Sequence, residues 1–175
     1  MNIARRLVPL LLLALPGLAL AHGPVRLKVE EGIKIAAPAD KVWALVKDFC
    51  SISTWHPLVA KCDGKGGDKE GATRTLTLKA GGKIEEELVK YEDGKSYKYK
   101  ITQGDLKVLP VSNYQSTLSV EATGSEATVK WKGAFYRGEP RNNPPKELND
   151  EAATGAVTKI YKEGLANLKK LAEKK

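Results

Sequence analysis

The sequence predicts an α+β domain in which an antiparallel sheet of about six to seven strands precedes one long C-terminal helix. Between residues 26 and 137, apolar and polar residues alternate in short segments, the pattern typical of half-buried strands. Turn dipeptides divide these segments at Gly81-Gly82, Asp93-Gly94 and Gly124-Ser125, so consecutive strands are expected to pair as hairpins. From residue 149 a helical period replaces the alternation.

The first expected elements are a strand and a short helix. Apolar residues alternate with charged ones along the strand, at Leu27, Val29, Ile33 and Ile35. Pro38 suits the first position of the helix, where its missing N–H costs nothing, and Asp40 places a carboxylate near the positive end of the helix dipole. A stripe with helical spacing gives this helix one apolar face, formed by Val42, Leu45, Val46 and Phe49. The aromatic turn Trp55-His56-Pro57 then leads into the next strand.

The following strands are expected to form a meander. Arg74, Leu76 and Leu78 share one strand face, and Tyr97, Tyr99 and Ile101 share another. Residues 111–121 and 127–137 form a further expected hairpin. The consecutive glutamates Glu85, Glu86 and Glu87 offer carboxylates on both strand faces, but they are interpreted as solvated charge rather than as a catalytic pair.

The last element is a helix from about Asp150 to Lys174. Asn149 is a suitable N-cap, and the expected apolar face consists of Ala153, Val157, Ile160, Gly164, Leu168 and Leu171. Gly155 and Gly164 each cost about 1 kcal/mol relative to alanine within a helix, which implies either close packing on the sheet or space left for a ligand. The proline-containing loop 139–146 is expected to be an ordered lid over the space between helix and sheet.

The run from Ile35 to Pro57, with Ala37-Pro38 and Val42-Trp43 at the start of its helix, resembles the helix-grip superfamily of START, Bet v 1-like and polyketide cyclase domains. This resemblance implies a curved antiparallel sheet wrapped around the C-terminal helix, with two short helices after the first strand. It also implies an apolar cavity between sheet and helix. Residues expected to line it have apolar bodies and polar tips or charges: Trp55, His56, Arg74, Tyr97, Tyr99, Tyr114, Trp131 and Tyr136.

Shorter motifs resemble the MxaD family of periplasmic accessory proteins of methanol oxidation. They include the Trp55-His56-Pro57 turn, the Arg74–Leu78 strand, Phe135–Gly138 and Pro144-Pro145. This resemblance implies a protein that promotes the interaction of methanol dehydrogenase with its cytochrome c acceptor. The alternative is a carrier of a hydrophobic small molecule, or a polyketide-cyclase-like enzyme, that uses the same cavity.

The N-terminus is interpreted as an export signal. Arg5 and Arg6 precede an apolar segment that ends in the small-residue site Ala19-Leu20-Ala21, so residues 1–21 are expected to be cleaved. A membrane anchor is the competing interpretation, but the apolar run is short for a spanning helix. Residues 22–175 would then form a single periplasmic domain. Losing two arginines lowers the formal net charge from +8 to +6, which favours an acidic protein partner over nucleic acid.

Cys50 and Cys62 are expected to meet as a disulfide in an oxidising compartment, although two separate buried thiols are the alternative. Metal binding by the mature N-terminal residue His22 together with His56 is considered but not favoured, because Pro24 cannot supply a deprotonated amide. With two histidines and no catalytic motif, the sequence predicts no catalytic residues and no cofactor.

Overall fold

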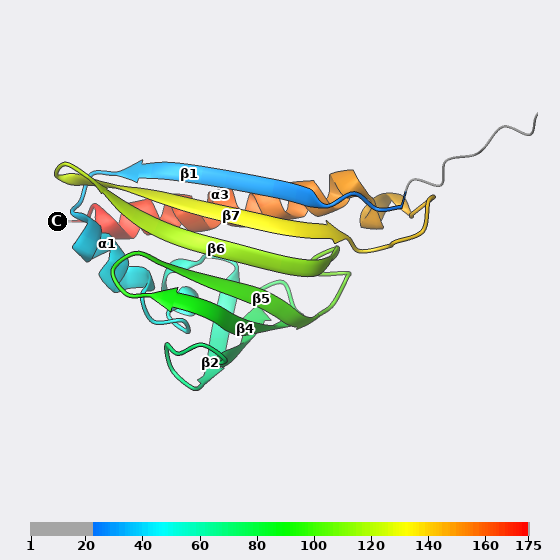
Figure 1. Ribbon diagram of the computed structural model, residues 1–175, viewed down its shortest axis with the longest axis horizontal. Coiled ribbons are helices and arrows are strands. Elements are labelled where there is room, and N and C mark those ends of the chain that lie inside the picture. The colour runs from blue at the N-terminus through cyan, green and yellow to red at the C-terminus, as the bar shows by residue number, and fades with distance from the viewer. Residues whose placement is uncertain (1–22, 175) are drawn as a thin grey trace, which may run out of the picture.

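The structure, a computed structural model, describes residues 23–174. Its seven strands form one antiparallel sheet in the order β1-β7-β6-β5-β4-β3-β2 (Figure 1). The strands are β1 (Leu27–Ile35), β2 (Val59–Lys65), β3 (Thr73–Leu78), β4 (Lys83–Glu92), β5 (Ser96–Gly104), β6 (Val111–Thr123) and β7 (Glu126–Arg137). The meander from β2 to β7 brings the last strand back to the first, since every residue of β1 pairs with β7. The predicted helix-grip α+β fold is confirmed.

Four helical segments complete the domain: α1 (Ala39–Val46), α2 (Ile52–Trp55), the 3-10 turn η1 (Lys146–Leu148) and α3 (Asp150–Ala172). Figure 1 shows α3 running lengthwise along β1 and β7. Asn149 caps α3 as expected, because its side chain accepts a hydrogen bond of 2.8 Å from the Ala152 N–H. None of the helices within residues 23–174 combines the length and apolar character needed to cross a membrane.

The buried face of α3 is displaced slightly from the predicted one. Tyr161 and Leu165 are buried, whereas the predicted Ile160 and Leu171 are only half-buried. A stripe of apolar residues on a helix is wide enough to admit both sets, and contact with the sheet selects the set centred on Tyr161. The complete buried face consists of Ala153, Val157, Tyr161, Gly164, Leu165, Leu168 and Ala172.

The first helix is shorter than its apolar stripe suggested. Pro38 is its N-cap rather than its first helical residue, and the helix ends at Val46, before Phe49. Phe49 is nevertheless buried, because its N–H donates a 2.7 Å hydrogen bond to Asp68 and its ring packs against Tyr97. The signal peptide proposed for residues 1–21 lies outside the described residues.

Candidate functional site

A small cavity lies between the inner face of the sheet, the corner from α2 to β2, and α3. Its volume is about 60 Å³. Four half-buried apolar side chains form the part of the lining nearest to solvent, here called the mouth: Leu58, Leu78, Ile101 and Ile160. The buried lining includes six side chains with polar atoms: His56, Glu86, Tyr99, Tyr114, Trp131 and Tyr161. The cavity is therefore apolar at its mouth and has polar groups in its interior.

The most unusual feature of this region is a buried ion pair between Arg74 and Glu86. The two residues are directly opposite each other on β3 and β4, and both point to the inner face of the sheet. Arg74 Nε donates to Glu86 Oε2 at 2.6 Å, and the two side chains are 1% and 6% exposed. Glu86 was interpreted from the sequence as solvated charge, and this was wrong. Its carboxylate tolerates burial because the guanidinium opposite neutralises it.

Aromatic and backbone groups hold Arg74 in place. Its Nη1 donates to the carbonyl oxygen of Phe49, and its guanidinium lies 3.9 Å from the centre of the Phe49 ring. The ring of Tyr99 lies 5.0 Å from the guanidinium on a second side. Such cation–π contacts strengthen when the cation is removed from water. Arg74 therefore acts as a fixed support that orients Glu86.

The ion pair leaves one carboxylate oxygen for the cavity. Burial raises the pKa of Glu86 against the opposing effect of Arg74, but the close pairing with an arginine keeps the carboxylate charged. Arg74 is the hydrogen-bond donor to Glu86 among residues 23–174, and it donates to Oε2 rather than to Oε1. Glu86 belongs to the cavity lining, whose surface is otherwise almost entirely apolar.

Three hydroxyl groups are hydrogen-bonded in a row, and the donor in each bond can be deduced because the row ends at a carbonyl oxygen, which can only accept. Ser116 Oγ must donate to the Lys132 carbonyl oxygen, 2.9 Å away, so it accepts from the Tyr161 hydroxyl at 2.8 Å. Tyr161 in turn accepts from the Tyr114 hydroxyl at 2.6 Å. Burial raises the pKa of both tyrosines, which therefore remain protonated. Each hydroxyl in this row has its proton committed to another protein group.

Tyr99 differs from the other tyrosines of the cavity. Its hydroxyl accepts a 3.0 Å hydrogen bond from Trp131 Nε1 and also interacts with the side chain of Ser116. Burial raises the pKa of Tyr99, so the hydroxyl is protonated and can donate. The lining of the cavity thus includes an acceptor, Glu86 Oε1, and a protonated donor, the Tyr99 hydroxyl, while the buried Arg74 Nη2 behind the wall is a further donor without a partner among residues 23–174.

His56 is a structural residue in this arrangement. Its Nε2 donates to the Ile160 carbonyl oxygen at 3.0 Å, and its Nδ1 accepts from the Leu58 N–H at 3.2 Å. A carbonyl can only accept, so these two contacts fix the neutral tautomer that carries its proton on Nε2. Burial lowers the pKa of His56 to about 4. Both nitrogens are occupied, so His56 is not free to bind a metal, and His22 lies outside the described residues.

Two glycines allow the aromatic residues to approach closely. A Cβ atom on Gly164 would lie 2.6 Å from His56 Cδ2 and 2.9 Å from a ring carbon of Trp131. A Cβ on Gly133 would lie 2.3 Å from the Tyr161 hydroxyl oxygen. The Tyr161 ring stacks on Trp131 with its centre 4.5 Å away. Of the two explanations considered for Gly164, close packing is therefore the one that the structure supports.

The predicted cavity residues fall into three groups. His56, Tyr99, Tyr114 and Trp131 line the cavity, whereas Trp55, Arg74 and Tyr97 are buried behind its wall. Tyr136 does not belong to the site, because it alternates with the inward-facing Phe135 and points to the outer face, where Arg26 lies over its ring. The loop 139–146 is not a lid, since none of its residues lines the cavity.

Tyr161 and Glu86 were missed as site residues. Tyr161 follows Val157 by one helical turn and precedes Gly164, which was a usable signal for an inward position. Glu86 lies between Ile84 and Leu88 in the alternation, which was a comparable signal on a strand.

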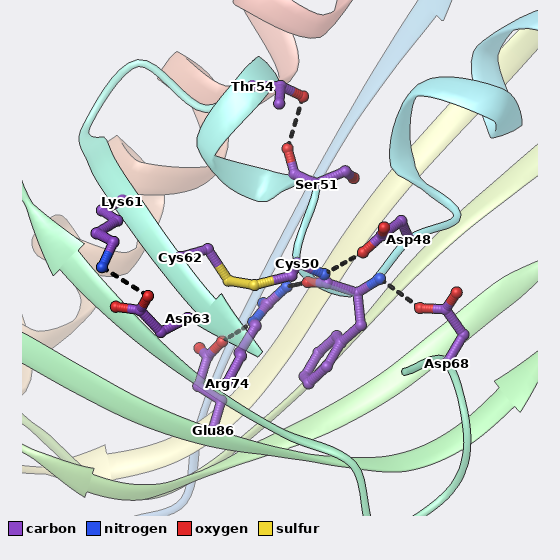
Figure 2. The surroundings of a disulfide bond; sticks show 11 residues. Asp48, Cys50, Ser51, Thr54, Lys61, Cys62, Asp63, Asp68, Arg74 and Glu86 are labelled. Atoms are coloured by element: carbon purple, nitrogen blue, oxygen red, sulfur yellow. Dashed lines mark hydrogen bonds and ion pairs between the residues drawn. A yellow bond between two sulfur atoms is a disulfide. The ribbon is translucent and has the colours of Figure 1, made fainter. Parts of the chain in front are cut away.

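Cys50 and Cys62 form a disulfide beside the ion pair, and Figure 2 shows Arg74 and Glu86 next to it. Their Cα atoms lie 5.6 Å apart. The bond joins the segment after α1 to β2. Further hydrogen bonds fix the same segment, because Asp48 accepts from the Cys50 N–H and Asp68 accepts from the Phe49 N–H, each at 2.7 Å. The segment that holds the Phe49 carbonyl against Arg74 is thus anchored from several sides.

Within residues 23–174, no group of three or more His, Cys, Asp or Glu side chains is arranged to hold a metal ion. The site is a compact apolar cavity with a charge-neutral ion pair in its wall, a design suited to an uncharged molecule.

Comparison with known proteins agrees with the helix-grip architecture. The family model described as "Polyketide cyclase / dehydrase and lipid transport" matches residues 26–173, and the chain belongs to this family. No curated protein matches the sequence.

Several solved structures are similar. The protein XoxI from Bacillus cereus is 28% identical with a TM-score of 0.69, and the match covers 82% of this chain and 94% of that one. A protein from Nitrosospira multiformis is 24% identical with a TM-score of 0.65, over 82% of this chain and 94% of the other. Norcoclaurine synthase from Thalictrum flavum, solved with dopamine and hydroxybenzaldehyde, is 17% identical with a TM-score of 0.62, over 96% and 99% of the two chains. The last two similarities concern the fold alone.

Proposed function

We propose that the protein binds a small, mostly apolar molecule that carries a hydroxyl group. The observation that carries this proposal is the presence, in the lining of one apolar cavity, of Glu86, whose Oε1 accepts no hydrogen bond from residues 23–174, and of the protonated Tyr99 hydroxyl. A hydroxyl group can donate to the first and accept from the second. The description of the family, which includes lipid transport, supports a role in binding an apolar ligand.

The net charge of the site favours a neutral ligand over an amine. Glu86 is already neutralised by Arg74, so a bound cation would add an uncompensated charge to an apolar interior. A carboxylate would meet the charge of Glu86 directly. An alcohol or a phenol satisfies both groups without bringing a charge.

The size of the cavity indicates how such a molecule is held. A cavity of roughly 150 Å³ is needed to enclose a benzene ring, and the cavity here is about 60 Å³. The hydroxyl end would therefore enter the cavity while the apolar body lies among the mouth residues Leu58, Leu78, Ile101 and Ile160. These side chains are half-buried at the end of the lining and can change rotamer with less disruption than the buried ones.

A carrier is favoured over a cyclase-like enzyme. Both nitrogens of His56 are committed to backbone groups, and the chain Tyr114–Tyr161–Ser116 has its protons committed as well. Glu86 is tied to Arg74 at 2.6 Å, which fixes one of its two oxygens in the ion pair. The groups that could exchange protons with a ligand serve instead as fixed hydrogen-bond partners.

The test compares ligands that differ only in the hydroxyl group. Binding of 4-ethylphenol and of 4-ethyltoluene is measured by the change in tryptophan fluorescence, because Trp131 lines the cavity. A hydrogen bond to a charged acceptor contributes about 1.5 to 3 kcal/mol, so the phenol should bind roughly tenfold to a hundredfold more tightly. Equal affinity for the two compounds, or no binding of either, would overturn the proposal.

A matched pair of variants locates the ligand. Tyr99→Phe removes the donor hydroxyl and should reduce the preference for the phenol, whereas Tyr136→Phe removes a hydroxyl on the outer face and should leave it unchanged. Equal effects of the two substitutions would exclude the cavity as the binding site.

We also propose that the protein is exported to the periplasm. The support is the Arg5-Arg6 start, the apolar run and the Ala19-Leu20-Ala21 site in the sequence. The intact mass of natively expressed protein should correspond to a chain that begins at His22. A full-length chain retained in the membrane fraction would contradict this proposal.

A second candidate function is support of methanol oxidation, through promotion of the encounter between methanol dehydrogenase and a c-type cytochrome. It is supported by the motif resemblance and by the net positive charge of the chain. Addition of the protein should then accelerate cytochrome reduction by methanol without changing dehydrogenase turnover with an artificial dye. An unchanged rate of cytochrome reduction at every salt concentration would exclude this role.

A further inference from the structure

The outer face of the sheet, on the side away from the cavity, contains a groove with a volume of about 340 Å³. Uncharged side chains on the two central strands of the groove form its floor: Gln115, Thr117 and Ala134. Longer basic side chains from the flanking strands and β7 border it: Arg26, Lys28, Lys98 and Lys132. Figure 1 shows the four strands β1, β7, β6 and β5 side by side.

The strand register determines the dimensions of this groove. Lys28 on β1 is opposite Ala134 on β7, and Lys98 on β5 is opposite Thr117 on β6. Three inter-strand spacings separate β1 from β5, or roughly 14 Å. The floor is lowest at Thr117 and Ala134, whose side chains are short, whereas the longer Lys132 lies beside Thr117 on β7.

The groove has an excess of positive charge. Its lining contains four basic side chains and one carboxylate, Glu30, which pairs with Lys132 at 3.0 Å on the exposed surface. Among residues 23–174, no carboxylate lies within ion-pair distance of Arg26, Lys28 or Lys98. A partner that supplies carboxylates would therefore find cations that are not already engaged.

The basic residues of α3 differ in this respect. Lys159 lies 3.9 Å from Glu163, Lys162 lies 3.8 Å from Glu31, and Lys169 contacts Glu173. Three of the four lysines on α3 thus have carboxylate partners, and Lys170 is the exception. The difference singles out the groove as the more strongly positive surface.

We propose that this groove docks an extended, acidic polypeptide segment of a partner protein. An extended chain directs successive side chains to opposite sides, so neighbouring carboxylates can reach Lys28 on one border and Lys98 on the other. Both central strands, β6 and β7, are already paired on each side, so side chains and not backbone edges make the contact. Three of the four cations are lysines, which suit carboxylates spread along a chain, whereas phosphate recognition favours the bidentate geometry of arginine.

The test uses a fluorescein-labelled oligoglutamate peptide and fluorescence anisotropy at low ionic strength. The double variant Lys28→Glu, Lys98→Glu should weaken binding roughly tenfold or more. The matched control Lys159→Glu, Lys162→Glu changes the net charge by the same amount on α3 and should alter affinity much less. An equal loss of peptide affinity in both double variants would show that binding depends only on net charge. This result would refute docking in the groove.

A variant that fills the groove without changing its charge makes the test independent of electrostatics. Thr117→Trp places a bulky side chain on the floor, at a half-buried strand position where aromatic residues are favoured. This variant should lose peptide binding while its circular dichroism spectrum and its binding of 4-ethylphenol stay unchanged. Undiminished peptide binding would refute docking in the groove.

Two further probes test the chemical class of the partner. The wild-type protein should bind the oligoglutamate peptide more tightly than an oligonucleotide of equal charge and than vesicles that contain anionic lipid. Tighter binding of either alternative would overturn the assignment to an acidic polypeptide. Because the groove and the cavity lie on opposite faces of the sheet, failure of this proposal leaves the ligand-binding proposal intact.

Discussion

Replacing Gly164 by alanine tests how closely α3 approaches the interior of the grip. The added Cβ would lie 2.6 Å from His56 Cδ2, 2.8 Å from His56 Nε2 and 2.9 Å from a ring carbon of Trp131. The His56 ring cannot retreat easily, because both nitrogens are hydrogen-bonded, to Ile160 and to Leu58. The clash outweighs the gain of about 1 kcal/mol in helix propensity, so we expect a net loss of about 1 to 3 kcal/mol of stability.

The same helix provides the control. A Cβ on Gly155 would have no neighbouring atom within 4 Å, so Gly155→Ala should gain roughly 0.5 to 1 kcal/mol from helix propensity alone. In a thermal unfolding experiment followed by circular dichroism, Gly164→Ala should lower Tm by roughly 3 to 10 °C and Gly155→Ala should raise it slightly. Equal stabilisation by both substitutions would refute the close approach of α3 to His56 and Trp131.

Three other properties of the domain can be measured by unfolding. Arg74→Met leaves Glu86 buried without a partner and should lower the free energy of unfolding in urea by about 3 to 5 kcal/mol. The double variant Arg74→Met, Glu86→Leu should be much closer in stability to the wild type. Equal losses of stability in the two variants would show that the pair is not coupled. Removal of the Cys50–Cys62 disulfide by paired alanine substitution should cost about 2 to 3 kcal/mol, and peptide mass mapping of natively expressed protein should find the bond rather than two free thiols. Burial lowers the pKa of His56 from 6.5 to about 4, so the unfolded chain takes up a proton at this residue more readily than the folded one. The resulting contribution to folding stability, about 3 kcal/mol, is complete above about pH 6.5 and is lost as the pH falls toward 4. The stability advantage of the wild type over His56→Gln should shrink across that range, and a constant difference would contradict the neutral assignment.

The order of the elements was predictable because it depends on local signals. The turn dipeptide Asp93-Gly94 lies between β4 and β5 as expected, and Gly124-Ser125 lies between β6 and β7. Asn149 marked the start of α3 to the residue. Such signals act through the backbone of a few neighbouring residues and do not require knowledge of the distant packing.

The ion pair and the outward position of Tyr136 depended on strand parity and not on residue type alone. Tyr136 follows Phe135, which has the parity of the inward-facing Trp131, so its aromatic character was misleading. Glu86 lies on the same strand face as the buried Ile84 and Leu88, and its charge can be buried only because Arg74 lies directly opposite and neutralises it. That alignment belongs to the pairing of β3 with β4, which the alternation within one strand does not determine.

The size of the cavity was beyond the reach of sequence reasoning. It follows from how far the Tyr161 ring penetrates over Trp131, and this depends on the missing side chains at Gly133 and Gly164. These glycines lie on different elements, β7 and α3, so their combined effect arises only when the two elements pack together.

The position of the disulfide has a practical consequence for work with the purified protein. Cys50 follows directly after Phe49, whose carbonyl oxygen accepts from Arg74, and Arg74 holds Glu86 at the cavity. Protein produced in a reducing cytosol would lack the disulfide beside these contacts. The segment that holds Arg74, and with it Glu86, would then be fixed by hydrogen bonds alone (Figure 2). Thiol titration of each preparation before ligand screening would therefore show whether the disulfide has formed. A failure to bind a compound could then be assigned either to the compound or to a preparation in which Glu86 is not held in position.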